Sequence, residues 1–297
     1  MDNVVTTNGL TKHYGRIKAV DQLNFSVPVR SVFGILGPNG SGKTTTLGML
    51  LDVINPTSGT YTWFGNPPGK TNRQKIGSIL ETPAFYPYLS ASDNLRIIAE
   101  IKDAGRDNID NVLRLTGIYD RRNSAFSTFS LGMKQRLALS AALLSDPQVL
   151  ILDEPTNGLD PKGIAEIREL IRRIAIEGKT VILASHLLDE VQKVCTHFSV
   201  LDKGKLVYTG LVNDARGEQI LEISADDMDI LIDTLNAFSD KISVEAKGQF
   251  ALLTIPVNLS ISAVSRYLFE KGIYPTHLFA QKKSLETQFL EILKDKK

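Results

Sequence analysis

The sequence has a single cysteine, Cys195, among its 297 residues. One cysteine cannot form an internal disulfide, so folding does not require an oxidising compartment. The first residues also lack the basic and apolar stretches of a secretory signal. We therefore expect a cytosolic protein.

Long apolar runs are also missing. The longest, such as 149–152, end in charged residues after a few positions, whereas a membrane-spanning helix needs roughly 18 apolar residues. Any action at a membrane would then require a partner protein.

The chain has almost no excess charge of either sign. Its 34 basic and 33 acidic side chains leave a formal net charge of +1, which offers little long-range attraction to phosphate backbones. With 42% hydrophobic and 23% charged residues, the composition is typical of a folded globular protein. We therefore expect no nucleic-acid partner, although a local basic patch is not excluded.

The first part of the chain alternates apolar strands with helical patterns, which is typical of an α/β fold. Unbroken apolar runs at 31–36, 149–152 and 180–184 indicate strands inside a parallel sheet. Residues from about 90 to 145 show helical patterns without a convincing strand. We interpret them as a helical insert in the α/β core.

The pattern changes near Gly210. Beyond it, the sequence predicts strands and helices in the order βαββαβ, that of a ferredoxin-like unit, followed by a last helix at 284–293. We therefore divide the chain into an α/β domain at 1–213 and a small C-terminal α+β domain at 214–297.

A glycine-rich segment after the first predicted strand fits the spacing G-x-x-x-x-G-K-[ST] of a phosphate-binding loop. In such loops the backbone N–H groups surround phosphate oxygens, Lys43 would reach the outer phosphates, and the Thr44 hydroxyl would be a ligand of Mg²⁺. A plain glycine-rich turn does not account for the strand before it and the helix after it. The loop reads Gly37-Pro38-Asn39-Gly40-Ser41-Gly42-Lys43-Thr44.

Asp153 and Glu154 directly follow the predicted strand at 149–152. A carboxylate at this end of a buried strand beside a phosphate-binding loop can hold Mg²⁺, and a second one can accept a proton from an attacking water. The alternative is that Asp-Glu-Pro only starts a turn. The phosphate-binding loop favours the catalytic interpretation.

With these and further motifs in order, residues 3–213 resemble the ATP-binding subunit of ABC transporters. The segment at 129–136 is similar to the family signature, usually written LSGGQ. The other similar segments are the D-loop at 157–160, the switch histidine His186, and Tyr14 as the aromatic residue that stacks on adenine.

The resemblance implies an ATPase that closes as a dimer around two ATP molecules and drives a separate membrane permease from the cytoplasmic face. Glu154 would polarise the attacking water, and His186 would sense the γ-phosphate. The implied catalytic residues are Lys43, Glu154 and His186; the implied ATP ligands are Tyr14, Gly37, Pro38, Asn39, Gly40, Ser41, Gly42, Lys43, Thr44, Thr45, Ser130, Gly132 and Asp160; the implied Mg²⁺ ligands are Thr44, Asp153 and Glu81.

Each of these matches also has an ordinary structural explanation. Ser130 could only cap the following helix, Tyr14 could be a half-buried tyrosine, and Asp160 could simply start a helix with Pro161. His186 could be a hydrogen-bonded histidine at a strand end. Only the order and spacing of the whole set favour the ATPase.

The sequence departs from the family pattern at Phe129, Leu131 and Met133 of the signature and at Glu81. Leu131 replaces a glycine of the signature, which puts the closeness of dimer closure in question. Glu81 replaces the glutamine of the loop that links Mg²⁺ and water to the membrane partner, and it adds negative charge there; it could instead be a surface residue. At Glu81 and residues 83–87, the sequence resembles that of ATPase subunits of bacitracin-resistance and lantibiotic self-immunity exporters.

The resulting hypothesis is ATP-driven export of a peptide antibiotic or another amphipathic, drug-like compound. A soluble ABC ATPase acting on ribosomes or nucleic acid is the main alternative. Such proteins typically carry two nucleotide-binding units or a long coiled-coil insertion, and neither is present in this sequence. Glu154 and His186 argue against a third option, a module that binds ATP without hydrolysing it.

Overall fold

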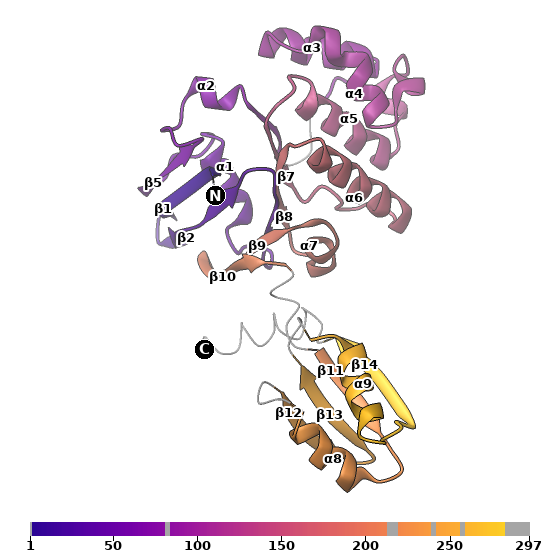
Figure 1. The fold of residues 1–297 in the computed structure, drawn as a ribbon. Coiled ribbons are helices and arrows are strands. Elements are labelled where there is room, and N and C mark those ends of the chain that lie inside the picture. Colours follow the sequence, from indigo (N-terminus) through magenta and orange to yellow (C-terminus); the bar gives the residue numbers. More distant parts are fainter. Residues whose placement is uncertain (1, 81–83, 213–218, 239–241, 256–258, 283–297) are drawn as a thin grey trace. The chain divides into compact units, whose positions relative to one another are not determined.

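The structure is a computed structural model, and it describes residues 2–80, 84–212, 219–238, 242–255 and 259–282. The chain forms two compact units, Met1–Gly210 and Leu211–Lys297. Figure 1 shows the elements of both in chain order.

A six-stranded sheet lies at the centre of the first unit, in the order β10-β9-β4-β8-β7-β6. Its strands are β4 (Val32–Leu36), β6 (Ile76–Ile79), β7 (Val149–Asp153), β8 (Thr180–Ser185), β9 (His197–Asp202) and β10 (Lys205–Leu211). The pairs β4–β8, β4–β9, β6–β7 and β7–β8 are parallel. Every residue of β4, β7 and β8 is buried, as expected for strands covered on both faces. The three strands predicted from unbroken apolar runs are confirmed.

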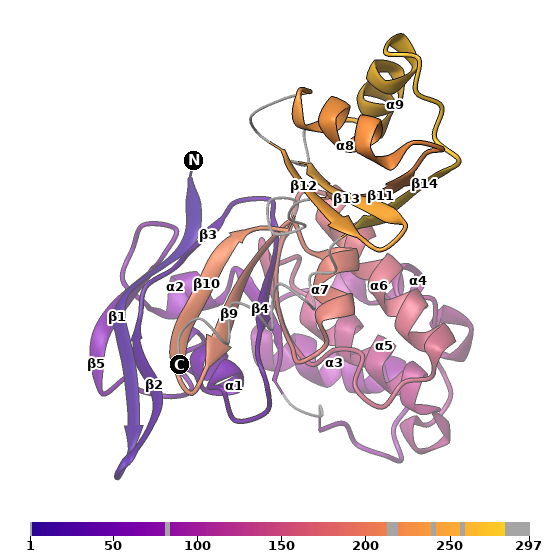
Figure 2. The same cartoon turned by 90° about the horizontal axis from the view of Figure 1, so that it is seen from below.

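An antiparallel sheet forms one side of the first unit, and the helices between residues 91 and 194 form the other, with β4 and β9 between them (Figure 2). Its strands are β1 (Asn3–Tyr14), β2 (Ile17–Leu23), β3 (Ser26–Pro28) and β5 (Ser58–Trp63), and β1 pairs with each of the others. The core joins the two sheets: the ring of Phe25 stacks on Phe33 at 5.7 Å. The Trp63 indole N–H donates to the carbonyl oxygen of Leu50 at 2.8 Å.

The helices of the first unit pack against the parallel strands or against one another. They are α1 (Lys43–Leu50), α2 (Lys70–Arg73), α3 (Ala91–Lys102), α4 (Ile109–Leu115), α5 (Leu131–Leu143), α6 (Pro161–Ile176) and α7 (Leu188–Val194). Helices α3, α4 and α5 make up the predicted insert at 90–145, where a lone bridge between Ser90 and Ala125 replaces any strand. Helix α1 packs against β7 and β8, which brings its N-terminus to the carboxyl ends of these strands.

The second unit is built from β11 (Gln219–Ser224), α8 (Met228–Asn236), β12 (Ser243–Lys247), β13 (Phe250–Ile255), α9 (Ile261–Glu270) and β14 (His277–Lys282). Its sheet order is β12-β13-β11-β14 with antiparallel pairs, the ferredoxin-like arrangement. Side chains of the sheet and both helices share one core, with Leu221, Leu231, Leu253 and Val264 fully buried. The helix predicted at 284–293 lies outside the described residues.

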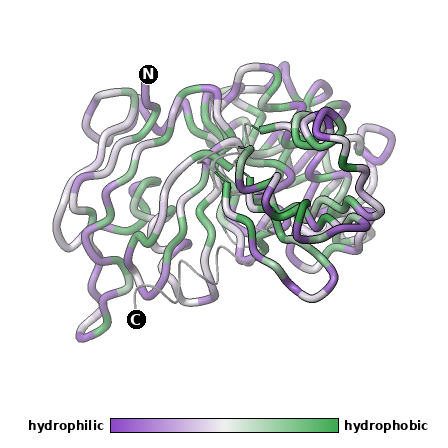
Figure 3. Tube along the Cα trace, turned by 60° about the horizontal axis from the view of Figure 1, so that its bottom comes forward, coloured by the Kyte–Doolittle hydropathy of each residue, from purple (hydrophilic) through white to green (hydrophobic). Residues whose placement is uncertain are grey.

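Hydrophobic and hydrophilic stretches alternate along the trace (Figure 3). Within the described ranges, each helix is too short or too polar to cross a membrane.

Candidate nucleotide-binding site

The loop between β4 and α1 runs unusually close to neighbouring backbone. A Cβ added at Gly37 would lie 2.3 Å from the carbonyl oxygen of Leu201 and 2.5 Å from Ser41 Oγ. Gly42 has a φ of +102°, and its added Cβ would lie 2.4 Å from the carbonyl oxygen of Ala19. Only glycine fits both positions without displacement. The first N–H groups of α1, which have no partner within the helix, therefore lie at the opening of the loop.

Lys43 is the first residue of α1, and its ammonium group turns back over the loop. Its Nζ donates to the carbonyl oxygens of Gly37 at 2.8 Å and Pro38 at 3.3 Å and lies 3.4 Å from Glu154 Oε1. The lysine is buried, being 6% exposed, and these acceptors offset the cost of burying its charge. A fixed cation beside a helix N-terminus is suited to bind phosphate oxygens.

The carboxylates at the end of β7 point to the same place. Thr44 Oγ1 donates to Asp153 Oδ2 at 2.7 Å. Glu154 has a left-handed backbone with φ of +46°, and its N–H donates to the carbonyl oxygen of Ala184 at 3.0 Å. This conformation costs a non-glycine residue roughly 1–2 kcal/mol, and such strain concentrates at functional sites. In this protein the strained residue is Glu154, whose carboxylate faces Lys43.

His186 follows the last residue of β8 and completes the cluster. Its Nδ1 lies 2.9 Å from Glu154 Oε2, so the Glu154 carboxylate lies between an imidazole and the Lys43 ammonium. The carboxyl ends of parallel strands share one edge of a sheet, where open α/β proteins bind ligands. The structure therefore brings together five predicted residues: Lys43, Thr44, Asp153, Glu154 and His186.

A buried carboxylate, Glu190, lies behind this cluster. It is 3% exposed and accepts hydrogen bonds from Ser185 Oγ at 2.6 Å and from Thr156 Oγ1. Sequence reasoning missed it, because an acidic residue in the first turn of a helix usually compensates the helix dipole in solvent. Nothing local in the sequence signals its burial.

The signature residues form a second group at the N-termini of α5 and α6. Ser130 Oγ accepts from the Met133 N–H at 3.4 Å, and Asp160 Oδ1 accepts from the Gly163 N–H at 2.9 Å. Both residues are thus helix caps. They also line one pocket of about 420 Å³ together with Gly132, so the cap does not hide them.

Of the remaining candidate residues, Leu131 lines the same pocket as Ser130 and Gly132. Leu131 is half exposed and reaches within 3.1 Å of the Cβ position of Gly158, so its side chain leans on the D-loop. Tyr14, at the end of β1, is 48% exposed, and the Lys12 ammonium lies 5.1 Å from its ring centroid. Glu81 lies outside the described residues.

A phosphate-binding loop on a parallel sheet, with paired carboxylates at the end of the neighbouring strand, is characteristic of P-loop nucleoside triphosphatases. A sequence model described as "ABC transporter" matches residues 20–157. The chain belongs to the ABC transporter family and is an ATP-binding subunit with the ATPase class of activity.

Two relatives illustrate this family membership. The bacitracin transport ATP-binding protein BcrA of Bacillus licheniformis is 38% identical over 301 residues, covering 99% of this chain and 98% of the relative. The lantibiotic transport ATP-binding protein SrtF of Streptococcus pyogenes is 37% identical over 198 residues, covering 67% of this chain and 86% of the relative. The resemblance to the bacitracin and lantibiotic group is therefore confirmed.

Solved structures agree on the fold. The structure of cbiO1 from Clostridium perfringens, part of the ABC transporter complex cbiONQ, has a TM-score of 0.65 and 29% identity, covering 72% of this chain and 90% of that one. The dimeric ABC transporter cassette MJ0796 has a TM-score of 0.63 at 24% identity, covering 70% of this chain and 98% of that one. The predicted fold class is confirmed.

Proposed function

We propose that this chain hydrolyses ATP with Glu154 as the general base and thereby drives export through a separate membrane permease. The observation that carries the proposal is the position of the Glu154 carboxylate, between Lys43 Nζ at 3.4 Å and His186 Nδ1 at 2.9 Å. These two groups hold the carboxylate at the mouth of the phosphate-binding loop. There it can orient a water molecule and take its proton.

The other residues of this cluster bind and orient the triphosphate. The N–H groups at the start of α1 and the Lys43 ammonium neutralise phosphate oxygens. His186, held against Glu154, presents its imidazole to the γ-phosphate. The chain contributes residues 37–45 to this cradle, and the exposed ring of Tyr14 is available to stack on adenine.

Thr44 and Asp153 suit Mg²⁺. Their donors are a hydroxyl and a carboxylate oxygen, the types that this ion prefers, and they already lie 2.7 Å apart. Bound there, Mg²⁺ would neutralise charge on the phosphates. We include Glu81 in the same ligand set, from its place in the sequence.

We further propose that two copies close around ATP. Ser130 and Gly132 line an open pocket with Asp160, and Ser130 lies at a helix N-terminus, which favours anions. These residues would contact the γ-phosphate held by the partner copy. ATP then joins the copies, and its hydrolysis lets them separate.

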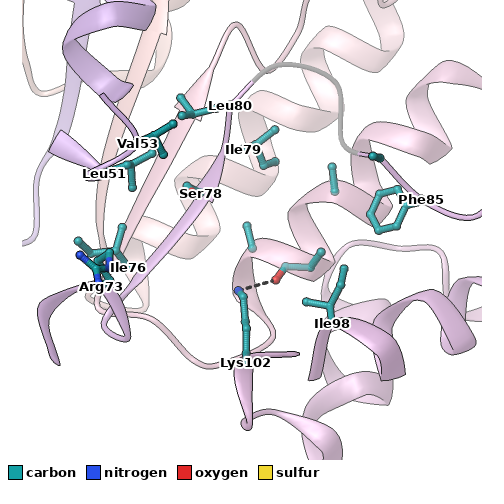
Figure 4. A pocket seen from close by; sticks show the side chains of 14 residues that line it. Leu51, Val53, Arg73, Ile76, Ser78, Ile79, Leu80, Phe85, Ile98 and Lys102 are labelled. Carbon is teal, nitrogen blue, oxygen red and sulfur yellow. Dashed lines mark hydrogen bonds between the residues drawn. The ribbon is translucent and has the colours of Figure 1, made fainter. Parts of the chain in front are cut away.

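A groove of about 550 Å³ offers a place for the permease (Figure 4). Its lining is mostly apolar, and it includes Ser78, Ile79 and Leu80 on one side of the Glu81 loop and Ala84 and Phe85 on the other. The Lys102 ammonium reaches its floor and donates to the carbonyl oxygen of Ala141 at 3.2 Å. A permease segment in this groove would contact Leu80 and Ala84, the described residues next to 81–83, and it would place the chain on the cytoplasmic face of the membrane.

The exported compound is proposed from similarity. BcrA and SrtF are bacitracin and lantibiotic transport proteins, which supports a peptide antibiotic as the cargo. These relatives do not support the alternative of a ribosome or nucleic-acid ATPase.

Glu154→Gln tests the proposed function. It keeps the size of the side chain but removes the base, so we expect ATP turnover to fall at least about a hundredfold while ATP still binds. Phosphate release measures turnover, and size-exclusion chromatography with ATP should show a stable dimer. Glu169→Gln, an exposed change on α6, is the control and should turn over ATP like the wild type. Unimpaired hydrolysis by Glu154→Gln would refute the assigned base.

A further inference from the structure

Three buried side chains form a continuous hydrogen-bonded chain behind the Glu154–His186 pair. The Leu187 N–H donates to Ser185 Oγ at 3.0 Å, and Ser185 Oγ donates to Glu190 Oε2 at 2.6 Å. Thr156 Oγ1 donates to the other carboxylate oxygen, Oε1. Ser185, Thr156 and Glu190 are 0%, 4% and 3% exposed, so bulk water does not compete for these bonds.

The two ends of this hydrogen-bonded network lie next to the catalytic candidates. Ser185 directly precedes His186, and Thr156 lies two residues after Glu154. Glu190 reaches both from α7, so a single carboxylate connects the end of β8 to the turn after β7. The same two segments are also joined by the β7–β8 pairing, which ends at Asp153 and Ala184, and by the bond from the Glu154 N–H to the Ala184 carbonyl oxygen.

The Glu190 carboxylate sets the direction of the hydrogen bonds from Ser185 and Thr156. Both hydroxyl groups donate to the Glu190 carboxylate, so their hydrogens point toward it and both hydroxyl rotors are fixed. Bonds to a charged acceptor are shorter and stronger than neutral ones. An amide in its place would put a donor against one hydroxyl, whose own hydrogen would then need another buried acceptor.

We infer that Glu190 is a positioning residue for ATP hydrolysis, an inference that rests on the proposed roles of Glu154 and His186. Its carboxylate holds the strand end that carries His186 and the turn that carries Glu154 at the spacing where Nδ1 and Oε2 lie 2.9 Å apart. Glu190 itself does not touch the reacting atoms. Its loss therefore changes the rate of the chemical step and leaves ATP binding by the loop at 37–45 intact.

The test uses the full chain with Glu190→Gln and with Thr156→Val, which removes one hydroxyl without changing the shape of the side chain. We expect each to lower kcat roughly ten- to hundredfold, since small displacements of reacting groups have effects of this size. The KM for ATP should stay within about twofold, because nucleotide binding is unchanged. The double variant should lose about as much as the more severe single variant, since both break one network.

Asp189→Asn is the matched control. Asp189 is the neighbouring residue on α7, but its carboxylate is exposed and pairs with Arg168 and Lys193 at the surface. We expect wild-type kcat for this variant.

A spectroscopic measurement separates positioning from stability. The chain has four histidines, so ¹⁵N-histidine labelling gives few signals, and His186→Gln identifies those of His186. The Nδ1 resonance of His186 should move in Glu190→Gln and Thr156→Val and stay in place in Asp189→Asn.

Wild-type kcat and an unmoved His186 resonance in Glu190→Gln would overturn the inference. A second result would also overturn it: Thr156→Val loses activity, but the loss is accompanied by a lower melting temperature and a higher KM for ATP. The network would then stabilise the fold without positioning the catalytic residues. Failure of the proposed function looks different: the wild type would not hydrolyse ATP, or Glu154→Gln would hydrolyse it normally.

Discussion

Gly37 shows how a single residue constrains the phosphate-binding loop. Its added Cβ would overlap the carbonyl oxygen of Leu201, which belongs to β9. Backbone cannot rotate aside as a flexible side chain can, so the loop itself would have to shift. The requirement for glycine here is therefore steric.

Gly37→Ala should weaken ATP binding and lower the stability of the first unit by about 1–3 kcal/mol, the usual effect of overpacking. Thermal unfolding and titration with a fluorescent ATP analogue measure the two effects. Gly69→Ala is the control, because Gly69 has extended backbone with φ of 174° and nothing within 4 Å of its Cβ position. Equal melting temperatures for both variants would contradict the steric explanation.

Residues that carry chemistry in a local motif could be predicted from the sequence, and the structure shows why others could not. Lys43 and Thr44 belong to a spacing with one physical purpose, and Asp153 and Glu154 follow an apolar run that can only be a buried strand. Glu190 acts through residues 34 and 5 positions away. A partnership of that kind depends on tertiary packing and leaves no local pattern.

At the scale of helices and strands, the N-terminus of α5 combines two roles that the sequence left as alternatives. Ser130 caps the helix, and it also lines an open pocket. A cap uses one side-chain acceptor for the helix N–H groups and leaves the hydroxyl hydrogen free to donate elsewhere. The structural role and the proposed contact with ATP are therefore compatible.

Substitution of Ser130 by a charged cap separates these roles. Ser130→Asp should keep the stability of the chain within about 0.5 kcal/mol, because aspartate is an equally good cap. It should abolish ATP-driven dimerisation and most hydrolysis, because its charge repels the γ-phosphate of the partner's ATP. Ser130→Asn, an uncharged cap, should stay considerably more active, as measured by phosphate release. Equal activity of the two variants would argue that this helix end does not meet a phosphate.

Whether a strand could be predicted from the sequence depended on whether one or both of its faces are buried. Strands β4, β7 and β8 are buried on both faces and read as unbroken apolar runs, so they stood out in the sequence. Strand β1 mixes buried and exposed residues along its length, and its pairings with β2, β3 and β5 contain register shifts. A strand with such irregular pairing has no clear period of two, which explains why this sheet was not predicted.

At the scale of the whole chain, each unit has a hydrophobic core of its own. The core of the first unit is made by residues up to Leu201, and that of the second begins at Leu221. No buried residue belongs to both of these clusters. We infer that the ATP-binding unit does not need the second unit to fold.

A chain of residues 1–212 should therefore unfold cooperatively and hydrolyse ATP at a rate close to that of the full chain. Calorimetry and phosphate release measure these properties. An insoluble or inactive fragment beside an active full chain would show that the second unit is part of the enzyme.

Communication with the permease is a property of the assembled transporter. Glu81→Gln should leave basal ATP hydrolysis largely intact but weaken its coupling to export, because the described residues next to it in the sequence, Leu80 and Ala84, line the groove proposed for the permease. Cells that express the variant with its permease should then resist the peptide antibiotic less well, at an unchanged rate of ATP hydrolysis by the purified subunit. Unchanged resistance would refute the coupling role.

Trp63 is the only tryptophan in the chain, and it is 1% exposed and bonded to the end of α1. The first unit therefore contains a natural fluorophore in a dry environment, and the second unit contains none. Light absorbed only by indole excites the ATP-binding unit alone, and its emission moves to longer wavelength when water reaches the ring. Fluorescence thus follows the unfolding of one unit, whereas far-ultraviolet circular dichroism records both.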